Sequence, residues 1–211
     1  MRIGVFGGAF DPPHAAHAAL AVAAKRQLDL NLILWVPTFA PPHKGGPVAS
    51  FAARTAMVRA LVSPLNAAAP DSEVSDLEAT LPQPSYTLQT LRALKQLWPH
   101  RGEAHDWYLI LGADNRANFL RWHQPEAVLA EATLAVYPRA GFPLSGKPAA
   151  GAQSLPPAVM LDFPLMPDQS TEFREALSAG ALRREEALAR LPEPVAAYIR
   201  AQGLYLSGEK T

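Results

Sequence analysis

Apolar residues in this chain form short runs that alternate with longer stretches of helical spacing. The short runs predict strands at 3–6, 32–36, 73–78, 107–111, 133–137 and 159–163. The longer stretches predict helices at 15–28, 51–62 and 85–98, after Pro125, from near Glu172, and at 183–191 and 194–202. This alternation is typical of an α/β fold. We expect a Rossmann-like, doubly wound, mostly parallel sheet with helices on both faces and a small helical portion at about 170–205.

The first twenty residues combine a strand, two glycines and two histidines. The apolar run 3–6 meets Gly7-Gly8, and Asp11-Pro12-Pro13 then precedes His14 and His17 at the start of an alanine-rich helix. We expect the order strand, glycine turn, helix. A backbone without Cβ atoms can approach an oxyanion closely, and a helix N-terminus presents unpaired N–H groups and a positive dipole end. The pattern predicts a phosphate site that two imidazoles reach from the side.

Two other interpretations of this histidine pair are a pair of buried core residues and two metal ligands on one helical face. A metal site needs a third protein ligand, and Asp11 stands alone nearby in a chain that has no thiolates. Pro12-Pro13 fixes the chain where the helix begins and directs both rings out of the loop rather than into the core. We therefore favour phosphate contact.

Composition narrows the classes of function. The chain has 211 residues, 49% of them hydrophobic, which suits a single domain, 1–211, with a full core. Nineteen basic and nineteen acidic residues leave no net charge, so neither nucleic acid nor a membrane is an expected partner. The absence of cysteine excludes disulfides, thiolate zinc sites and thiol catalysis, and it is compatible with a cytoplasmic location. The sequence has no signal-peptide profile and no run of about eighteen apolar residues.

A second candidate segment follows the predicted strand 107–111. Gly112-Ala113-Asp114-Asn115 stands at the carboxyl end of that strand, where ligands bind in an open parallel sheet. We therefore expect Gly112 and Asp114 to lie beside the opening loop. Neither the dinucleotide fingerprint G-x-G-x-x-G nor the Walker A motif occurs, so hydride-transfer and P-loop functions lose their usual support.

Several motifs together resemble one family. The run from Gly7 to His17 resembles the H-x-G-H signature of the nucleotidyltransferase superfamily. Further motifs follow in the family's order: Pro41-Pro42-His43-Lys44, Ser85-Tyr86-Thr87, Gly112-Ala113-Asp114-Asn115 with Trp122, Ser170-Thr171 with Arg174, and a tail from Leu191-Pro192-Glu193 to Gly203-Leu204-Tyr205. With these, nearly the whole chain resembles the bacterial nicotinate-nucleotide adenylyltransferases.

Two motifs depart from the family pattern. Ala16 replaces the glycine between the two histidines. The late motif, usually I-S-S-T-x-I-R, reads DQSTEFR in this chain, with Gln169 in place of the first serine.

The resemblance implies that adenylyl transfer from ATP to nicotinate mononucleotide gives deamido-NAD and pyrophosphate, with Mg²⁺ on the triphosphate. This reaction is one in-line displacement without a covalent intermediate, so positioning and charge neutralisation carry the catalysis. The implied catalytic residues are His14, His17 and Arg174. The implied ATP-binding residues are Gly7, Gly8, Ala9, Phe10, Gly112, Asp114, Ser170 and Thr171. The implied residues for nicotinate mononucleotide are Lys44, Thr87, Trp122 and His123, and no protein ligand to a metal is expected.

The resemblance also implies individual roles. His17 would stabilise the α-phosphate, while Thr171 and Arg174 would hold the β- and γ-phosphates. Asp114 would accept hydrogen bonds from the ribose of the adenosine, and Trp122 would stack on the nicotinate ring. Lys44 would meet the phosphate of the mononucleotide.

Other interpretations stay open. The nearest is an adenylyltransferase acting on nicotinamide mononucleotide or phosphopantetheine, because the residues alone do not distinguish an acid from an amide. From other classes come a nucleotide-binding regulator without turnover and a histidine-metal hydrolase. The expected partners are small-molecule substrates, and the chain is expected to be a monomer or a homodimer.

Overall fold

A parallel sheet forms the centre of the molecule. The computed structural model describes residues 1–40, 48–68, 71–97, 105–142, 155–166 and 169–206. Within these ranges six strands form one sheet in the order β3-β2-β1-β4-β5-β6, and every pairing between them is parallel. The strands are β1 (Arg2–Gly8), β2 (Leu32–Pro37), β3 (Ser72–Val74), β4 (Asp106–Gly112), β5 (Thr133–Tyr137) and β6 (Val159–Met160).

The strand order reverses between β1 and β4. Ile3 of β1 stands opposite Leu32 of β2 on one side and opposite Trp107 of β4 on the other. The chain proceeds outward from β1 in one direction and from β4 in the other, so a crevice opens beyond the carboxyl ends of these two strands. The segments that follow them carry His14 and Asp114, which therefore lie at the same edge of the sheet.

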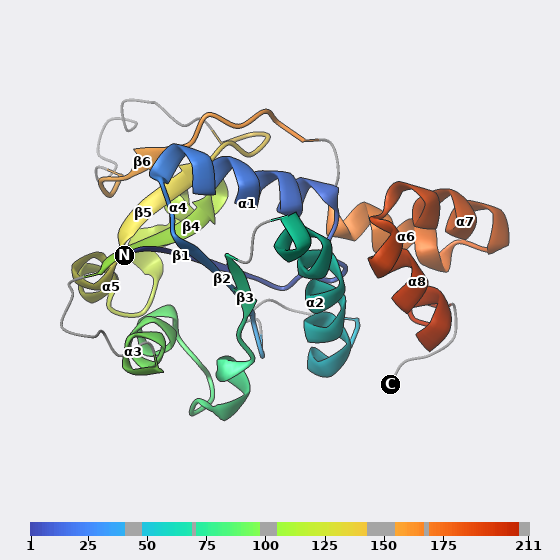
Figure 1. Cartoon of the computed structure of the whole chain (residues 1–211), viewed down its shortest axis with the longest axis horizontal. Helices are drawn as coiled ribbons and strands as arrows, with labels where there is room; N and C mark the ends of the chain where they lie inside the picture. The colour runs from blue at the N-terminus through green and yellow to red at the C-terminus, as the bar shows by residue number, and fades with distance from the viewer. Residues whose placement is uncertain (41–47, 69–70, 98–104, 143–154, 167–168, 207–211) are drawn as a thin grey trace.

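Helices cover both faces of the sheet (Figure 1). The α-helices are α1 (Ala15–Leu28), α2 (Phe51–Ala68), α3 (Thr87–Leu97), α4 (Ala113–Asn118), α5 (Pro125–Glu131), α6 (Ser170–Ser178), α7 (Ala181–Arg190) and α8 (Glu193–Gln202). Two short 3₁₀ helices, η1 (Leu77–Thr80) and η2 (Phe119–Arg121), lie between them. None of the helices in the described ranges is both long enough and apolar enough to cross a membrane.

Each face of the sheet has its own apolar core. On β2, Ile33 and Trp35 pack into the cluster that contains α1 and α2, whereas Leu32 and Leu34 pack into the cluster that contains α3 and α5. Successive side chains of a strand point to opposite faces, so a strand buried on both faces is apolar throughout. This explains why the central strands appear in the sequence as uninterrupted hydrophobic runs.

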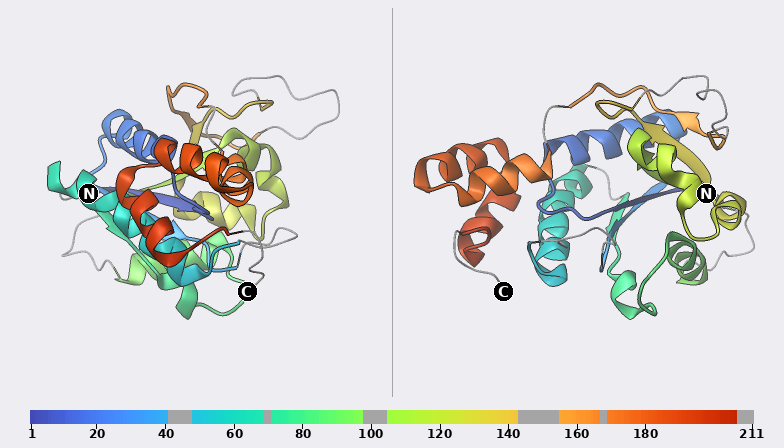
Figure 2. Two further views of the ribbon diagram at one scale, coloured as in Figure 1. Left: turned by 90° about the vertical axis from the view of Figure 1, so that its right-hand side faces the viewer. Right: turned by 180° about the vertical axis from the view of Figure 1, so that it is seen from behind.

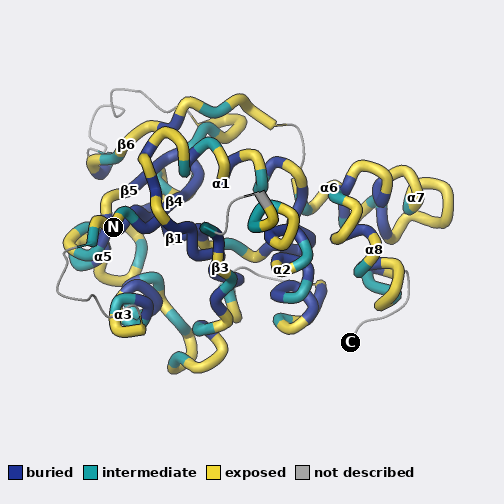
Figure 3. Tube along the Cα trace, in the orientation of Figure 1, coloured by how far each residue is buried: buried dark blue, intermediate teal, exposed yellow. Residues whose placement is uncertain are grey.

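The last helices extend the first of these clusters. Val195 and Ile199 of α8 are fully buried in the cluster that contains α1 and α2. Helices α6–α8 form one end of the molecule, and the left view of Figure 2 faces this end directly. The tube in Figure 3, coloured by residue burial, shows buried residues along the central strands and mostly exposed residues along α7.

The structure confirms the predicted fold class and most of the predicted elements. One correction concerns Gly7 and Gly8, which continue β1 opposite Val36 and Pro37 instead of forming a turn. Pairing with the apolar end of β2 carries the strand this far. The turn comes later, where Phe10 has a φ of 49°.

The predicted strands at 73–78 and 159–163 are both too long. After Val74 the chain turns, because the Ser75 side chain accepts a hydrogen bond from the Leu77 N–H (3.3 Å) and η1 begins. After Met160 the chain leaves the sheet, because the N–H of Asp162 donates a hydrogen bond to the side chain of Gln27 in α1 (2.8 Å) instead of to a strand.

The predicted helix at 51–62 is too short. Helix α2 runs past Pro64 to Ala68, although a proline inside a helix removes one backbone hydrogen bond. Leu65 packs against the core, and the Asn66 side chain both donates to and accepts from the backbone of Ser72. These contacts hold the last turns of the helix in place.

Candidate active site

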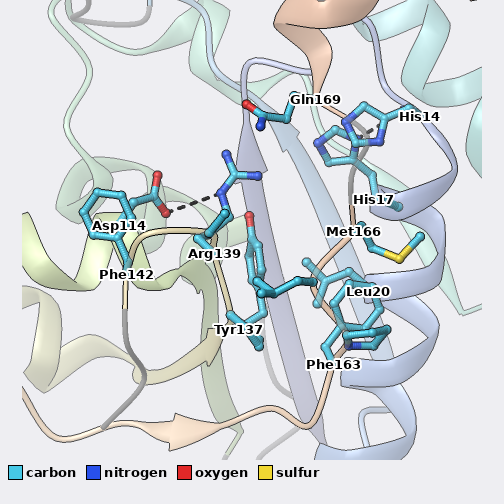
Figure 4. Close-up of a pocket in the computed structure, with 15 residues that line it drawn as sticks. His14, His17, Leu20, Asp114, Tyr137, Arg139, Phe142, Phe163, Met166 and Gln169 are labelled. Atoms are coloured by element: carbon cyan, nitrogen blue, oxygen red, sulfur yellow. Dashed lines mark hydrogen bonds and ion pairs between the residues drawn. The ribbon is translucent and has the colours of Figure 1, made fainter. Parts of the chain in front are cut away.

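A cavity lies at the carboxyl edge of the sheet, between the start of α1 and the segments that follow β4 and β5. Its polar lining residues are His14, His17, Asp114, Tyr137, Arg139 and Gln169, and its apolar ones include Leu20, Phe142, Phe163 and Met166. Figure 4 shows the two imidazoles on one side and Asp114 with Arg139 across from them. The cavity therefore combines cationic and hydrogen-bonding groups with an apolar wall, a lining suited to a nucleotide.

His14 and His17 come together because the helix begins between them. His14 is the N-cap of α1 and has an extended backbone, and His17 is the third residue of the helix. Their ring centroids are 3.9 Å apart, and Phe173 of α6 stacks on His14 at 5.6 Å. His14 is only 4% exposed, so its ring is packed into protein while still lining the cavity.

The backbone fixes the proton of the His17 ring. The N–H of His14 donates to His17 Nδ1 at 3.2 Å, so Nδ1 is an acceptor and the neutral ring carries its proton on Nε2. Burial lowers the pKa of His17 well below its usual value, and the nearby His14 and Arg139 lower that pKa further. His17 is therefore a neutral N–H donor at neutral pH.

Asp114 lies across the cavity with an acceptor atom available. Its Oδ1 is buried and accepts no hydrogen bond from any residue that the structure describes, while the Nε of Arg139 lies 3.7 Å away. A Cβ at Gly112 would stand 2.3 Å from this same Oδ1. Glycine at 112 therefore leaves room for the carboxylate, whose free lone pairs suit a hydroxyl donor on a ligand.

Asp11 organises the opening loop from inside the protein. Its side chain is 3% exposed. Oδ2 accepts a hydrogen bond from the N–H of Val48 (2.8 Å), and Oδ1 accepts from the N–H of Ala49 (3.1 Å) and from the hydroxyl of Tyr205 (2.7 Å). Sequence reasoning weighed Asp11 only as an isolated metal ligand and missed this role, because its partners are remote in sequence.

Arg54 is a second buried residue that sequence reasoning missed. Its guanidinium donates to the backbone carbonyls of Ala9 (2.7 Å), Phe39 (3.2 Å) and Ala49 (3.2 Å). Burial lowers the pKa of Arg54, and the neighbouring Asp11 carboxylate opposes that shift. Arg54 therefore ties the opening loop to two further loop segments. In the sequence it looks like an ordinary helix arginine.

The residues at the start of α6 lie beside the opening loop but do not line the cavity. Ser170 Oγ donates to the carbonyl of Pro12 (3.0 Å). Arg174 donates to the carbonyl of Asp11 (2.7 Å) and to Thr171 Oγ1 (3.0 Å). These contacts join the motif at 170–174 to the loop that precedes His14.

The predicted acceptor residues form a separate group around the start of α3. Trp122 packs against Phe119 with ring centroids 5.0 Å apart. His123 stacks on Tyr86 at 4.2 Å, next to Thr87, the first residue of α3. None of Thr87, Trp122 and His123 lines the cavity that contains the two histidines. Lys44 lies outside the described residues.

A buried carboxylate supports this second group. Glu78 Oε2 accepts from the N–H of Phe39 (2.9 Å) and from the hydroxyl of Ser85 (3.2 Å), while Oε1 accepts from Thr90 Oγ1 (3.0 Å).

In the described ranges no group of three or more histidine, aspartate or glutamate residues could hold a metal ion.

The structure thus places a histidine pair at a helix N-terminus beside the switch point of a Rossmann-type sheet, where ligands bind in such sheets. Residues 5–176 match the family described as cytidylyltransferase-like, and the chain belongs to this class.

Full-length relatives specify the family. The chain is 38% identical to a nicotinate-nucleotide adenylyltransferase of Thermus thermophilus over 97% of this chain and 100% of the relative. It is 36% identical to one of Gloeobacter violaceus (97% and 96% covered) and 33% identical to one of Exiguobacterium sibiricum (97% and 99% covered). The chain belongs to the nicotinate-nucleotide adenylyltransferase family.

Solved structures agree on the fold. A Plasmodium falciparum nicotinic acid mononucleotide adenylyltransferase complexed with NaAD superposes with a TM-score of 0.75 at 20% identity, with 97% of each chain covered. The same protein complexed with APC gives a TM-score of 0.72 at 19% identity, with 97% of this chain and 96% of that chain covered.

The lowered pKa of His17 predicts a pH dependence of stability. Below about pH 6.5 the unfolded chain takes up a proton at this position, whereas the folded chain does so only at lower pH. The free energy of unfolding should therefore fall by up to about 1.4 kcal/mol per pH unit between these two pKa values. His17→Gln should lack this component, because glutamine still accepts the N-cap hydrogen bond but does not titrate. Urea denaturation of both proteins at pH 7.5, 6.5 and 5.5 measures the difference, and parallel stability curves would contradict it.

Proposed function

We propose that this chain transfers the adenylyl group of ATP to nicotinate mononucleotide, giving deamido-NAD and pyrophosphate in NAD biosynthesis. The observation that carries the proposal is the full-length match to relatives named for this activity, together with a switch-point cavity lined by His14, His17 and Asp114. The reactants imply a cytoplasmic location, where ATP is plentiful.

The reaction requires two anions to be held in line. A phosphate oxygen of nicotinate mononucleotide attacks the α-phosphorus of ATP, the new P–O bond forms, and the bond to the β-phosphate oxygen breaks as pyrophosphate leaves. The attacking oxygen is already anionic, so no general base is needed. The protein contributes by orienting the reactants and by neutralising the charge that develops.

His17 suits the developing charge at the α-phosphate. Its Nε2–H is a fixed donor, because Nδ1 accepts from the N–H of His14. A donor held in position before the reaction costs no reorganisation when charge develops. His14 adds a second imidazole within 3.9 Å of the first. The backbone from Gly7 to Phe10 supplies N–H groups for the triphosphate.

The other phosphates and the adenosine have separate supports. Thr171 and Arg174 at the start of α6 would hold the β- and γ-phosphates, with Ser170 fixing this helix to Pro12. Asp114 Oδ1, buried and available as an acceptor, would receive the ribose hydroxyls. Gly112 keeps the space that this requires.

The acceptor would lie at the group around the start of α3. Trp122 offers a ring face for stacking on the pyridine of nicotinate, and Thr87 and His123 would complete that pocket. Lys44 would meet the phosphate of the mononucleotide.

Mg²⁺ would enter with ATP. The imidazoles and the guanidinium of the cavity are donors that fit phosphate oxygens, and its one carboxylate falls short of the oxygen ligands that a metal coordination shell needs. Mg²⁺ bound to the triphosphate supplies charge neutralisation at the leaving group.

The acceptor is tested by supplying nicotinate mononucleotide, nicotinamide mononucleotide and phosphopantetheine separately with MgATP and measuring pyrophosphate release. We expect turnover chiefly with nicotinate mononucleotide. Faster turnover with either alternative would reassign the substrate. ATP binding without pyrophosphate release from any acceptor would identify a nucleotide-binding regulator instead.

Replacing His17 with alanine should lower kcat about 10²- to 10³-fold, the usual effect of removing one preorganised donor, with a smaller change in KM for ATP. His105→Ala is the matched control. His105 precedes β4 at the opposite edge of the sheet, and its removal should leave kcat unchanged. Steady-state kinetics measure both variants. Unchanged turnover in His17→Ala would refute the role given to His17.

Gly112→Ala should raise the KM for ATP about tenfold or more, because the new Cβ displaces the Asp114 carboxylate and one charge-assisted hydrogen bond to the ribose is lost. The KM for nicotinate mononucleotide should stay unchanged and serves as the internal control. In an Asp114→Ala background the effect should be smaller, because only the contacts of the new Cβ with Arg139 Cγ (2.9 Å) and Tyr137 Cζ (3.3 Å) remain. Equal increases in both KM values would indicate general damage to the fold instead.

A further inference from the structure

The end of the chain reaches back to its beginning through Tyr205. This residue follows α8 and is 7% exposed. Its hydroxyl donates to Asp11 Oδ1 at 2.7 Å across 194 positions of sequence. The backbone φ of Tyr205 is 61°, in the left-handed region that residues with a Cβ rarely adopt. The surrounding structure therefore holds the tyrosine in a conformation that it would not choose by itself.

Asp11 connects Tyr205 to Arg174. The carbonyl of Asp11 accepts from Arg174 Nη1 at 2.7 Å, and Oδ2 lies 3.8 Å from Arg174 Nε. The second guanidinium nitrogen, Nη2, donates to Thr171 Oγ1 at 3.0 Å. Asp11 thus accepts a hydrogen bond from the Tyr205 phenol with Oδ1 and faces the Arg174 guanidinium with Oδ2.

We propose that Tyr205 is a positioning residue, which acts through Asp11 to set the guanidinium of Arg174 for the β- and γ-phosphates of ATP. This inference rests on the proposed function, because it takes Arg174 to be a phosphate-binding residue. It brings the C-terminal segment, which lies outside the cavity, into the binding of one substrate.

The direction of the effect follows from the hydrogen-bonding capacity of the carboxylate. Tyr205 and the N–H of Ala49 share Oδ1, and the N–H of Val48 occupies Oδ2. Without the phenol, Oδ1 keeps one backbone donor and its negative charge is less well compensated. A buried charge that loses a donor attracts the nearest cation more strongly. Arg174 then turns toward Asp11 and away from the phosphates.

Steady-state kinetics of the full chain test the proposal. Tyr205→Phe should raise the KM for MgATP about five- to tenfold, the usual effect of one lost hydrogen bond, and leave the KM for nicotinate mononucleotide unchanged. Tyr198→Phe removes a phenolic hydroxyl from α8 itself and should leave both KM values unchanged. A purely structural role would lower the melting temperature of Tyr205→Phe without separating the two KM values, and that result overturns the proposal.

Arg174→Ala separates failure of this inference from failure of the proposed function. If Tyr205 acts through Arg174, Tyr205→Phe has no further effect on the KM for MgATP in the Arg174→Ala background. Additive effects overturn the inference. If Arg174→Ala alone leaves the KM for MgATP unchanged, the phosphate-binding role of Arg174 fails and the inference fails with it.

A second substitution covers the case in which Tyr205→Phe does not fold. Fluorotyrosine at position 205 keeps the ring and the hydroxyl but makes the phenol a stronger donor, so Asp11 is better compensated and the KM for MgATP should fall. An unchanged KM for MgATP in that protein overturns the proposal.

Discussion

The hydrogen bonds to the buried carboxylate of Asp11 hold together the edge of the sheet at which the candidate active site lies. The carboxylate accepts hydrogen bonds from the N–H groups of Val48 and Ala49 and from the hydroxyl of Tyr205. The backbone carbonyl of Asp11 accepts one from Arg174. Segments from the start, the first third and the end of the chain therefore meet at one residue. A buried charge is tolerated only when it is well paired, so the loop that leads into α1, with His14 at its N-cap, depends on all of these segments.

Charge balance around Asp11 links structure to chemistry. Two guanidiniums, those of Arg54 and Arg174, lie near one carboxylate, and each of the three guanidinium nitrogens of Arg54 donates to a backbone carbonyl. Arg174 keeps a contact with Thr171 at the N-terminus of α6. Arg54 thus joins loop segments of the protein to one another. Arg174 lies beside the N-terminus of α6, the end of a helix that favours anions. Under the proposed function, this arrangement gives a chain with no net charge a local site for the phosphates of ATP.

The sequence predicted the parts of this design that periodicity and topology control. The central strands are buried on both faces and so appear as hydrophobic runs, and the rule for carboxyl ends of parallel strands correctly brought Asp114 to the same cavity as His14 and His17. Gly7 and Gly8 were predicted to turn, because glycine alone does not reveal that a strand partner is present. The contacts of Asp11, Arg54 and Tyr205 could not be predicted, since all but one of these side-chain hydrogen bonds join positions 15 to 194 residues apart and leave no local pattern.

The two apolar clusters support His17 and Trp122 from opposite faces of the sheet. His17 packs near Phe10, which belongs to the cluster of α1, α2 and the C-terminal helices, whereas Trp122 packs against the cluster of α3 and α5. The sheet separates these clusters, so substitutions on one face need not disturb packing on the other. Under the proposed function, a substitution that reshapes the surroundings of Trp122 therefore need not disturb the packing behind His17, so the acceptor pocket can change while the phosphate-binding groups stay in place.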